Sequence, residues 1–206
     1  MKVVSNKFLT EAQKMSYLPL YFVGYSLVGW IYEVLLLLVR EGRLLNRGFL
    51  TGPWLPIYGI GGILVYLFVY PYSHQELMIP VGKRRLNIMS FVLFLAISLI
   101  AAVVELLSTY VMDWFHVDWT ILWEYYEFRW NFDGRIAILP SAIFGLCGVF
   151  MMKYIQPMLD DVRQNMNRRW VKWSCYLVIF IFAVDMCIHL RIGCHYTDVA
   201  IWTFYR

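Results

Sequence analysis

Five long apolar stretches dominate this chain of 206 residues. An α-helix needs about 20 mostly apolar residues to cross the hydrocarbon of a bilayer, because each residue advances the helix by only about 1.5 Å. The pattern therefore predicts an all-α, polytopic helical membrane protein with about five transmembrane helices. These helices are expected to form a single transmembrane domain over residues 1–206, with spans at residues 17–39, 53–72, 88–112, 136–159 and 171–192.

Composition narrows the class of protein further. The chain is 61% hydrophobic and 16% charged, whereas soluble globular proteins average about 45–50% apolar and about 25% charged residues. An ordinary soluble domain and a disordered chain are therefore excluded. The 18 Lys and Arg residues lie between the apolar stretches rather than in one patch, so no nucleic-acid partner is expected. The lipid bilayer is the first expected partner.

The placement of Lys and Arg predicts an orientation, because loops that face the cytoplasm carry an excess of both residues. With five spans, the N-terminus and the second and fourth loops lie on one side, and they carry eleven of the 18 basic residues. We therefore expect a multi-pass protein of the cell membrane with a cytoplasmic N-terminus and an extracytoplasmic C-terminus. The aromatic-rich segment 113–135 becomes a long extracytoplasmic loop, and residues 160–172 become a cytoplasmic loop.

Ionisable residues inside the spans are candidate functional residues, because burying a charge in hydrocarbon is costly. Glu33, Glu105 and Asp185 lie in three different spans, toward the predicted outer side, and Arg135 enters the fourth span at that level. One interpretation is structural, since such carboxylates can snorkel to water or pair with Arg. The alternative is a polar cavity open to the outside, in which the carboxylates face Arg135, Asn46 or Arg47.

The end of the last span carries four residues of types that can bind a metal. Asp185 and His189 are one helical turn apart, and Cys194 and His195 follow. Their spacing matches no strong zinc pattern. We therefore expect no metal and no cofactor.

Small residues line one face of three spans, where they allow helices to approach closely. Two of these faces share a pattern. Ser26 precedes Glu33 by seven residues, and Ser98 precedes Glu105 by seven. Each of these helices leads to an outer loop and then to a helix with an early proline, so the chain can contain two parallel helix-pair repeats, a device of transporters.

Several of these residues belong to longer motifs that resemble a known family. The motifs are Tyr-Ser-Leu-Val-Gly-Trp-Ile-Tyr-Glu at 25–33, Asn-Arg-Gly-Phe-Leu-Thr-Gly-Pro-Trp-Leu-Pro-Ile-Tyr-Gly at 46–59, Glu105, and the segment 123–136. Over roughly residues 17–153 they resemble the bacterial membrane family labelled putative ABC-transporter type IV, or CmpB-like. That family usually has Trp-Asp-Tyr-Ser where this chain has Trp-Glu-Tyr-Tyr at 123–126, so the acid is kept and the hydroxyl position is altered.

The resemblance implies a permease-like transport component with an outward-facing polar site inside the membrane. The chain has no phosphate-binding Gly-x-x-x-x-Gly-Lys-Ser/Thr motif, so it cannot itself hydrolyse ATP by that route. Five short spans are few for an independent carrier, so we expect a separate ATPase subunit or self-association into a homo-oligomer. The residues expected to bind substrate are Glu33, Asn46, Arg47, Glu105, Trp123, Glu124, Tyr125, Asn131 and Arg135.

Two other functions remain open. The chain could be a membrane-embedded enzyme acting on a lipid-linked or amphipathic substrate, with Glu33 and Glu105 as the acid–base pair, because burial raises the pKa of a carboxyl group toward neutrality. No nucleophile–base motif supports that chemistry. The chain could also be a non-catalytic assembly or sensor subunit.

Overall fold

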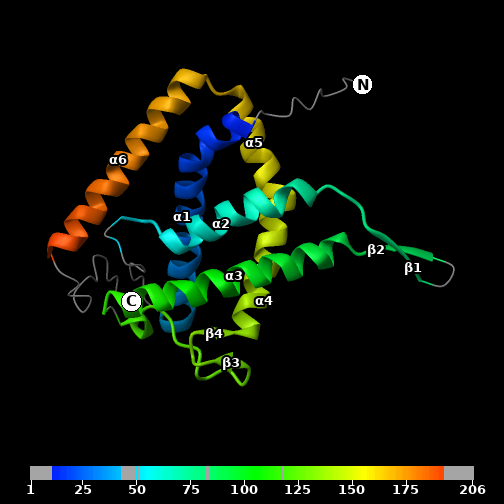
Figure 1. Ribbon diagram of the computed structural model, residues 1–206, viewed down its shortest axis with the longest axis horizontal. Helices are drawn as coiled ribbons and strands as arrows, with labels where there is room; N and C mark the ends of the chain where they lie inside the picture. The colour runs from blue at the N-terminus through cyan, green and yellow to red at the C-terminus, as the bar shows by residue number, and fades with distance from the viewer. Residues whose placement is uncertain (1–10, 43–49, 51, 82–83, 117, 193–206) are drawn as a thin grey trace.

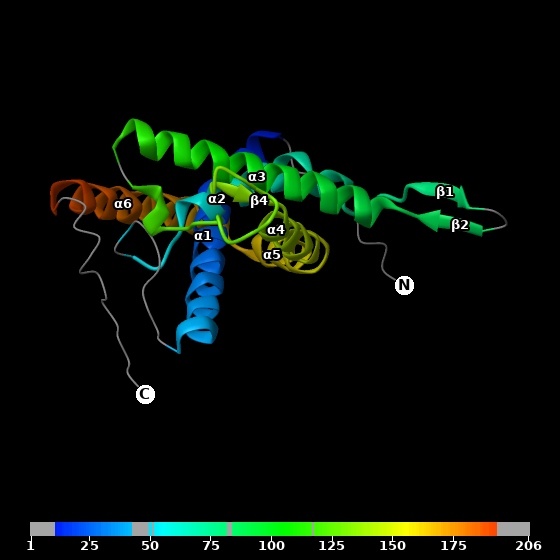
Figure 2. The ribbon, with the colours of Figure 1, turned by 90° about the horizontal axis from the view of Figure 1, so that it is seen from below.

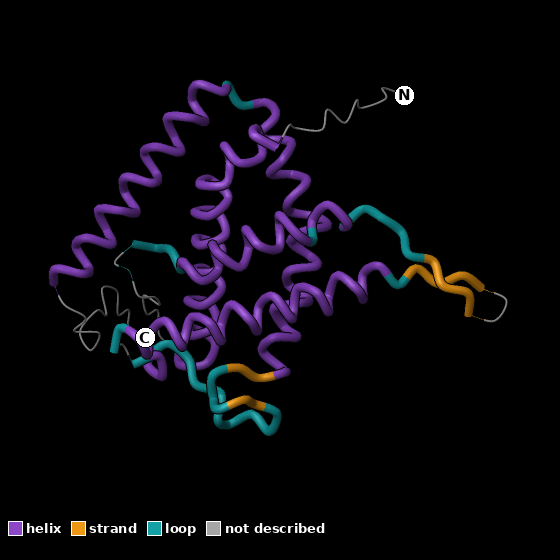
Figure 3. Tube along the Cα trace, viewed as in Figure 1, coloured by secondary structure: helices purple, strands orange, loops and turns teal. Residues whose placement is uncertain are grey.

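The computed structural model describes residues 11–42, 50, 52–81, 84–116 and 118–192. Within these residues, six α-helices form most of the structure. Two short 3₁₀ turns, one π-helical turn and two small β-hairpins complete it (Figures 1 and 3). The helices are α1 (Glu11–Glu41), α2 (Pro56–Phe68), α3 (Met89–Trp114), α4 (Ile138–Phe150), α5 (Gln156–Asn165) and α6 (Arg168–Ile192).

Four helical segments are long and apolar enough to cross a membrane. They are Tyr17–Arg40 in α1, Met89–Trp114 in α3, Ile138–Asn165, which joins α4 to α5, and Arg169–Ile188 in α6. The join is the π-helical turn η3 (Met151–Ile155). The all-α, polytopic membrane fold predicted from the sequence is therefore confirmed.

The second predicted span, 53–72, is shorter in the structure than expected. Helix α2 has 13 residues, which corresponds to about 20 Å against a hydrocarbon thickness of about 30 Å. It begins at Pro56 and gives way to the 3₁₀ turn η1 (Tyr70–Tyr72). Pro71 lies in that turn, and a proline has no N–H with which to continue the α-helical hydrogen bonding.

The first two helices form a close antiparallel pair. A Cβ atom added to Gly29 of α1 would lie 2.1 Å from the Tyr58 ring of α2, and one added to Gly62 of α2 would lie 2.4 Å from the Tyr25 ring of α1. Residues later in α2 thus contact residues earlier in α1, so the two helices run in opposite directions. Glycine permits this approach because it has no side chain.

Helices α3 and α4 form a second antiparallel pair of the same kind. A Cβ atom added to Gly145 of α4 would lie 2.0 Å from Ser98 Oγ of α3, and one added to Gly148 would lie 2.5 Å from the Ile97 side chain. The two pairs are joined by the hairpin of β1 (Met78–Val81) and β2 (Arg84–Asn87), which projects beyond the helices (Figures 1 and 2).

Helix α6 packs against α1, with the rings of Phe22 and Phe182 edge to face at 5.4 Å between centroids. The buried core lies where α1, α2, α3, η3 and α6 meet, and it contains the tyrosines Tyr17, Tyr21, Tyr25 and Tyr66. Many large apolar side chains are exposed instead, as expected for helices that face lipid rather than water.

The predicted outer loop is folded rather than extended. After α3, the chain makes a 3₁₀ turn, η2 (Trp119–Ile121), and then a hairpin of β3 (Asn131–Phe132) and β4 (Ile136–Ala137). Phe132 pairs with Ile136, so three residues join the two strands. The first two, Asp133 and Gly134, have positive φ values of 51° and 66°, a backbone conformation that Asp and Gly adopt more readily than most residues.

The segment 160–172, which the sequence predicts as a loop, differs from that expectation in the structure. Helix α5 continues to Asn165 and α6 begins at Arg168, so most of this segment is helical. The charged residues that suggested a loop, Asp160 and Arg163, lie on a helix face where they contact one another at 3.6 Å. Charged residues in this segment suggested contact with water, but Asp160 and Arg163 neutralise each other instead.

Candidate functional site

Two membrane-embedded carboxylates each accept a hydrogen bond from a tyrosine hydroxyl. Glu33 of α1 accepts from Tyr58 of α2, with 2.5 Å between the oxygens. Glu105 of α3 accepts from Tyr125, in the loop that follows α3, at 2.8 Å. We call Glu33, Tyr58, Glu105 and Tyr125 the carboxylate cluster.

Glu105 is the more deeply buried of the acidic groups in this cluster. Only 6% of the residue is exposed. Its Oε1 atom receives the Tyr125 hydroxyl, but its Oε2 atom has no hydrogen-bond donor among the residues that the structure describes. A buried carboxylate oxygen without a donor is costly, and a proton or a positively charged group would relieve that cost.

Aromatic rings and electrostatics join the two halves of the cluster. The rings of Tyr32, Tyr58 and Phe144 lie against one another, with centroids 5.7–6.3 Å apart. Burial, and next the charge of Glu105, raise the pKa of Tyr125 well above its ordinary value, and Glu33 adds to the increase. Tyr125 therefore remains protonated and can donate to Glu105, and both carboxylates act on the same hydroxyl.

The two helix pairs place equivalent residues in equivalent contacts. Ser26 of α1 lies against Gly59 of α2, where an added Cβ would be 2.4 Å from its Oγ, and Ser98 of α3 meets Gly145 of α4 in the same way at 2.0 Å. Both serine hydroxyls are buried without a partner among the described residues. The sequence pattern that links Ser26 with Glu33 and Ser98 with Glu105 thus has a counterpart in the packing.

Arg135 lies beside the cluster but pairs with other acids. Its guanidinium is 2.6 Å from Asp113 and 3.2 Å from Asp133. It also lies over the rings of Tyr110 and Trp119 at 4.9 and 4.8 Å. The hydrogen bond to Asp113 is the main cause that raises the pKa of Arg135. Instead of the expected pair with Glu105, Arg135 forms ion pairs that hold the β3–β4 hairpin to the end of α3.

The other predicted site residues in the loop that follows α3 occupy separate positions. Trp123 is half-buried and donates from Nε1 to the carbonyl oxygen of Arg135 at 3.2 Å. Asn131 shapes the hairpin, because its Oδ1 accepts from the N–H of Gly134 at 2.9 Å. Glu124 is exposed. The remaining two, Asn46 and Arg47, lie outside the described residues.

Asp185 of α6 holds the segment that precedes α2. Its Oδ2 accepts from the backbone N–H of Gly52 at 2.9 Å and from Trp54 Nε1 at 2.7 Å, and only 7% of the residue is exposed. This carboxylate therefore joins α6 to the segment between α1 and α2. The side chain of its predicted neighbour His189, and residues Cys194 and His195, lie outside the described part of the chain.

Sequence reasoning missed a second polar cluster, centred on Asp160 of α5. Its carboxylate accepts hydrogen bonds from the hydroxyls of Tyr21 and Tyr70, the latter at 2.7 Å, and from Gln156 at 3.2 Å. The Arg163 guanidinium lies 3.6 Å away. We call Tyr21, Tyr70, Gln156, Asp160 and Arg163 the Asp160 cluster.

The Asp160 cluster is tightly buried at the opposite end of the helices from Glu105. Gln156 is 0% exposed and accepts from the Tyr25 hydroxyl at 2.5 Å. A signal for it was present in the sequence, since Tyr17, Tyr21 and Tyr25 recur every four residues on one face of α1. That face needs polar partners for its hydroxyls, and α5 supplies them.

These observations define a polytopic helical membrane protein built from two antiparallel helix pairs and a further helix. The chain belongs to the family described as Putative ABC-transporter type IV, whose model matches residues 20–190. No curated protein and no solved structure matches the chain.

Proposed function

We propose that the chain is a permease-like component of a transport system, and that the carboxylate cluster is its outward-facing substrate site. One observation carries this proposal: Glu105 is buried and has one carboxylate oxygen without a donor among the described residues. Such an oxygen accepts a positive charge or a proton. The substrate class that suits the site is therefore a small molecule with a cationic group, or the proton itself.

The paired architecture supports transport over a purely structural role. Ser26 with Gly59, and Ser98 with Gly145, make equivalent contacts in two successive helix pairs. Transporters use such repeats to place a binding site between two similar halves that can rock against each other. Glu33 and Glu105, one from each half, are then the residues that a substrate would bridge.

The outer hairpin completes the proposed site. Tyr125 reaches into the cluster, and Trp123, Asn131 and Arg135 keep the hairpin folded around it. Glu124 belongs to its exposed side. Asn46 and Arg47 remain predicted substrate-binding residues on the other outer loop. A separate ATPase subunit or a second copy of the chain is proposed as partner.

Uptake measured in intact cells tests this function. Cells lacking the gene, cells with the wild-type chain and cells with Glu105→Gln would be given isotope-labelled small cations. We expect wild-type cells to accumulate at least one of these cations, and cells with the variant to resemble the deletion. Asp161→Asn, on the exposed side of α5, is the matched acidic control. Equal accumulation in all four strains would contradict transport.

The same compounds distinguish the enzyme alternative. Purified protein in detergent would be incubated with each labelled compound, and with lipid-linked analogues. A transport component leaves them chemically unchanged. Turnover that depends on both Glu33 and Glu105 would replace the proposal with a membrane-embedded enzyme.

The proposed orientation has its own test. A reporter fused after Arg206 should be active outside the cytoplasm, and one inserted between β1 and β2 should be active inside. The reverse pattern would place the carboxylate cluster on the cytoplasmic side and contradict an outward-facing site.

A further inference from the structure

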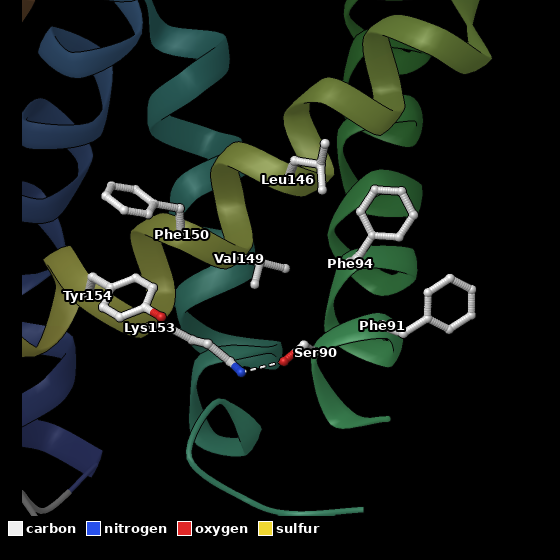
Figure 4. Close-up of a pocket in the computed structure, with 8 residues that line it drawn as sticks. All are labelled: Ser90, Phe91, Phe94, Leu146, Val149, Phe150, Lys153 and Tyr154. Carbon is white, nitrogen blue, oxygen red and sulfur yellow. Dashed lines mark hydrogen bonds between the residues drawn. The ribbon is translucent and has the colours of Figure 1, made fainter. Parts of the chain in front are cut away.

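An open apolar groove lies between α3 and the segment formed by α4 and η3 (Figure 4). Its volume is about 470 Å³. Its apolar wall consists of Phe91, Phe94, Leu146, Val149 and Phe150. Three of these side chains are more than half exposed: Phe91 by 59%, Leu146 by 64% and Phe150 by 56%. In a membrane this wall contacts lipid chains rather than water.

A cation closes one end of the groove. The Lys153 amino group donates a hydrogen bond to Ser90 Oγ at 2.5 Å, and Figure 4 shows this contact below the apolar side chains. No carboxylate of the described residues forms an ion pair with Lys153. The groove therefore offers an unneutralised ammonium group and a hydroxyl beside an apolar surface.

The backbone places Lys153 there by an unusual turn. Met151–Ile155 is π-helical, although the helix on either side is an α-helix. Single π-helical turns inside α-helices occur frequently at functional sites. The groove-lining residue Leu146 precedes this turn, and Gln156 of the Asp160 cluster follows it directly. The turn therefore lies between the groove and the Asp160 cluster.

The position of the groove along the membrane-spanning helices suits a lipid. Ser90 is the second residue of α3 and follows the exposed hairpin residues Arg84 and Arg85, so it lies where the apolar span begins. Leu146 precedes Lys153 by seven residues, which corresponds to about 10 Å further into the membrane. A headgroup at Lys153 would therefore place its acyl chain along the wall.

We infer that this groove binds one anionic phospholipid. Its phosphate accepts hydrogen bonds from Lys153 and Ser90, and one acyl chain lies against the apolar wall. Basic pockets between transmembrane helices are suited to anionic headgroups. Charge complementarity selects an anionic lipid, since Lys153 would otherwise keep an unpaired charge beside the start of the α3 span. The groove lies fifteen residues of α3 from Glu105, or about 22 Å, and is therefore separate from the carboxylate cluster.

Native mass spectrometry of the purified, delipidated full-length protein tests the inference. Phosphatidylglycerol and phosphatidylcholine with the same acyl chains would be titrated separately. We expect wild-type protein to retain one phosphatidylglycerol with at least tenfold higher affinity than phosphatidylcholine. Lys153→Gln should lose this preference and Lys153→Arg should keep it. Lys172→Gln is the matched control, because Lys172 is an exposed cation of α6 that does not line the groove.

Two further measurements separate binding of a whole lipid from binding of a phosphate group alone. Leu146→Trp should weaken phosphatidylglycerol binding without changing charge, because the larger side chain occupies part of the apolar groove. Glycerol phosphate, the water-soluble headgroup, should not compete at the same concentrations. Equal binding of both lipids by wild type, or an unchanged preference in Lys153→Gln, overturns the proposal. If Lys153→Gln fails to fold, the other two variants decide. Unchanged phosphatidylglycerol binding by Leu146→Trp overturns the proposal, and so does loss of the preference for phosphatidylglycerol in Lys153→Arg.

Discussion

The hydroxyl of Tyr125 donates a hydrogen bond of 2.8 Å to Glu105, twenty residues earlier in the chain. The contact joins the loop that follows α3 to a carboxylate inside the α3 span, so the loop and the helix share one hydrogen-bonded cluster. Tyr125 is itself fixed by a backbone hydrogen bond, from its N–H to the carbonyl oxygen of Gly134 at 2.9 Å. The hairpin therefore determines where the hydroxyl is held.

The first prediction concerns this hydrogen bond. Tyr125→Phe removes the donor and leaves both oxygens of Glu105 buried without a hydrogen bond, so the free energy of unfolding should fall by about 1–3 kcal/mol. Tyr126→Phe is the matched control, because Tyr126 is 55% exposed and should change stability by less than about 0.5 kcal/mol. Unfolding in detergent micelles measures both. Equal effects of the two substitutions would argue against the contact.

The second prediction concerns the partners of Arg135. Because its guanidinium pairs with Asp113 at 2.6 Å, Arg135→Gln and Asp113→Asn should not be additive, and the coupling energy should exceed about 0.5 kcal/mol. Arg135→Gln and Glu105→Gln should be additive within that limit. Double-mutant cycles of stability in detergent measure both couplings. A larger coupling with Glu105 than with Asp113 would restore the pairing expected from the sequence.

The third prediction compares two adjacent glycines of α2. Gly62→Ala would place a Cβ atom 2.4 Å from the Tyr25 ring, whereas Gly61→Ala meets nothing within 4 Å. Overpacking costs about 1–3 kcal/mol, so Gly62→Ala should lower the melting temperature and Gly61→Ala should not. Thermal unfolding of the two purified variants gives the comparison. Equal melting temperatures would mean that α1 and α2 do not pack through this face.

The fourth prediction compares two adjacent acids of α5. Asp160 accepts hydrogen bonds from Tyr21 and Tyr70 and adjoins Arg163, so Asp160→Asn should cost about 1.5–3 kcal/mol, as expected for hydrogen bonds to a charged group. Asp161 is exposed, and Asp161→Asn should have little effect. Both are measured by chemical unfolding in detergent. If neither substitution matters, the segment behaves as the solvated loop that the sequence suggested.

The fifth prediction is a pH dependence. Burial and Glu105 raise the pKa of Tyr125 in the folded protein, whereas an unfolded tyrosine has a pKa of about 10. Above that pH the unfolded chain loses this proton first, so the stability from Tyr125 is fully present below about pH 10 and is lost as pH rises toward the folded value. Wild type should therefore lose stability more steeply than Tyr125→Phe between about pH 10 and about pH 11. Parallel stability curves would contradict this.

The sequence by itself determined the class of fold, because hydrophobicity is a local property. Two stretches, 17–39 and 88–112, are apolar enough to require a bilayer whatever surrounds them. Helices α1 and α3 occupy these stretches in the structure. Glu33 and Glu105 were identifiable for the same reason, since a charge inside an apolar stretch is costly in any arrangement. The small residues beside them indicated the packing faces that the glycine contacts of both helix pairs use.

Only the tertiary structure decided which groups satisfy these charges. Tyr21 and Asp160 are 139 residues apart in the chain, and Trp54 and Asp185 are 131 apart. No local pattern specifies such pairs, because they depend on how the helices are placed relative to one another. Arg135 likewise pairs with Asp113 at the end of α3 rather than with Glu105. The apolar stretches therefore determined where the helices form, and long-range packing determined which hydrogen bonds and ion pairs connect them.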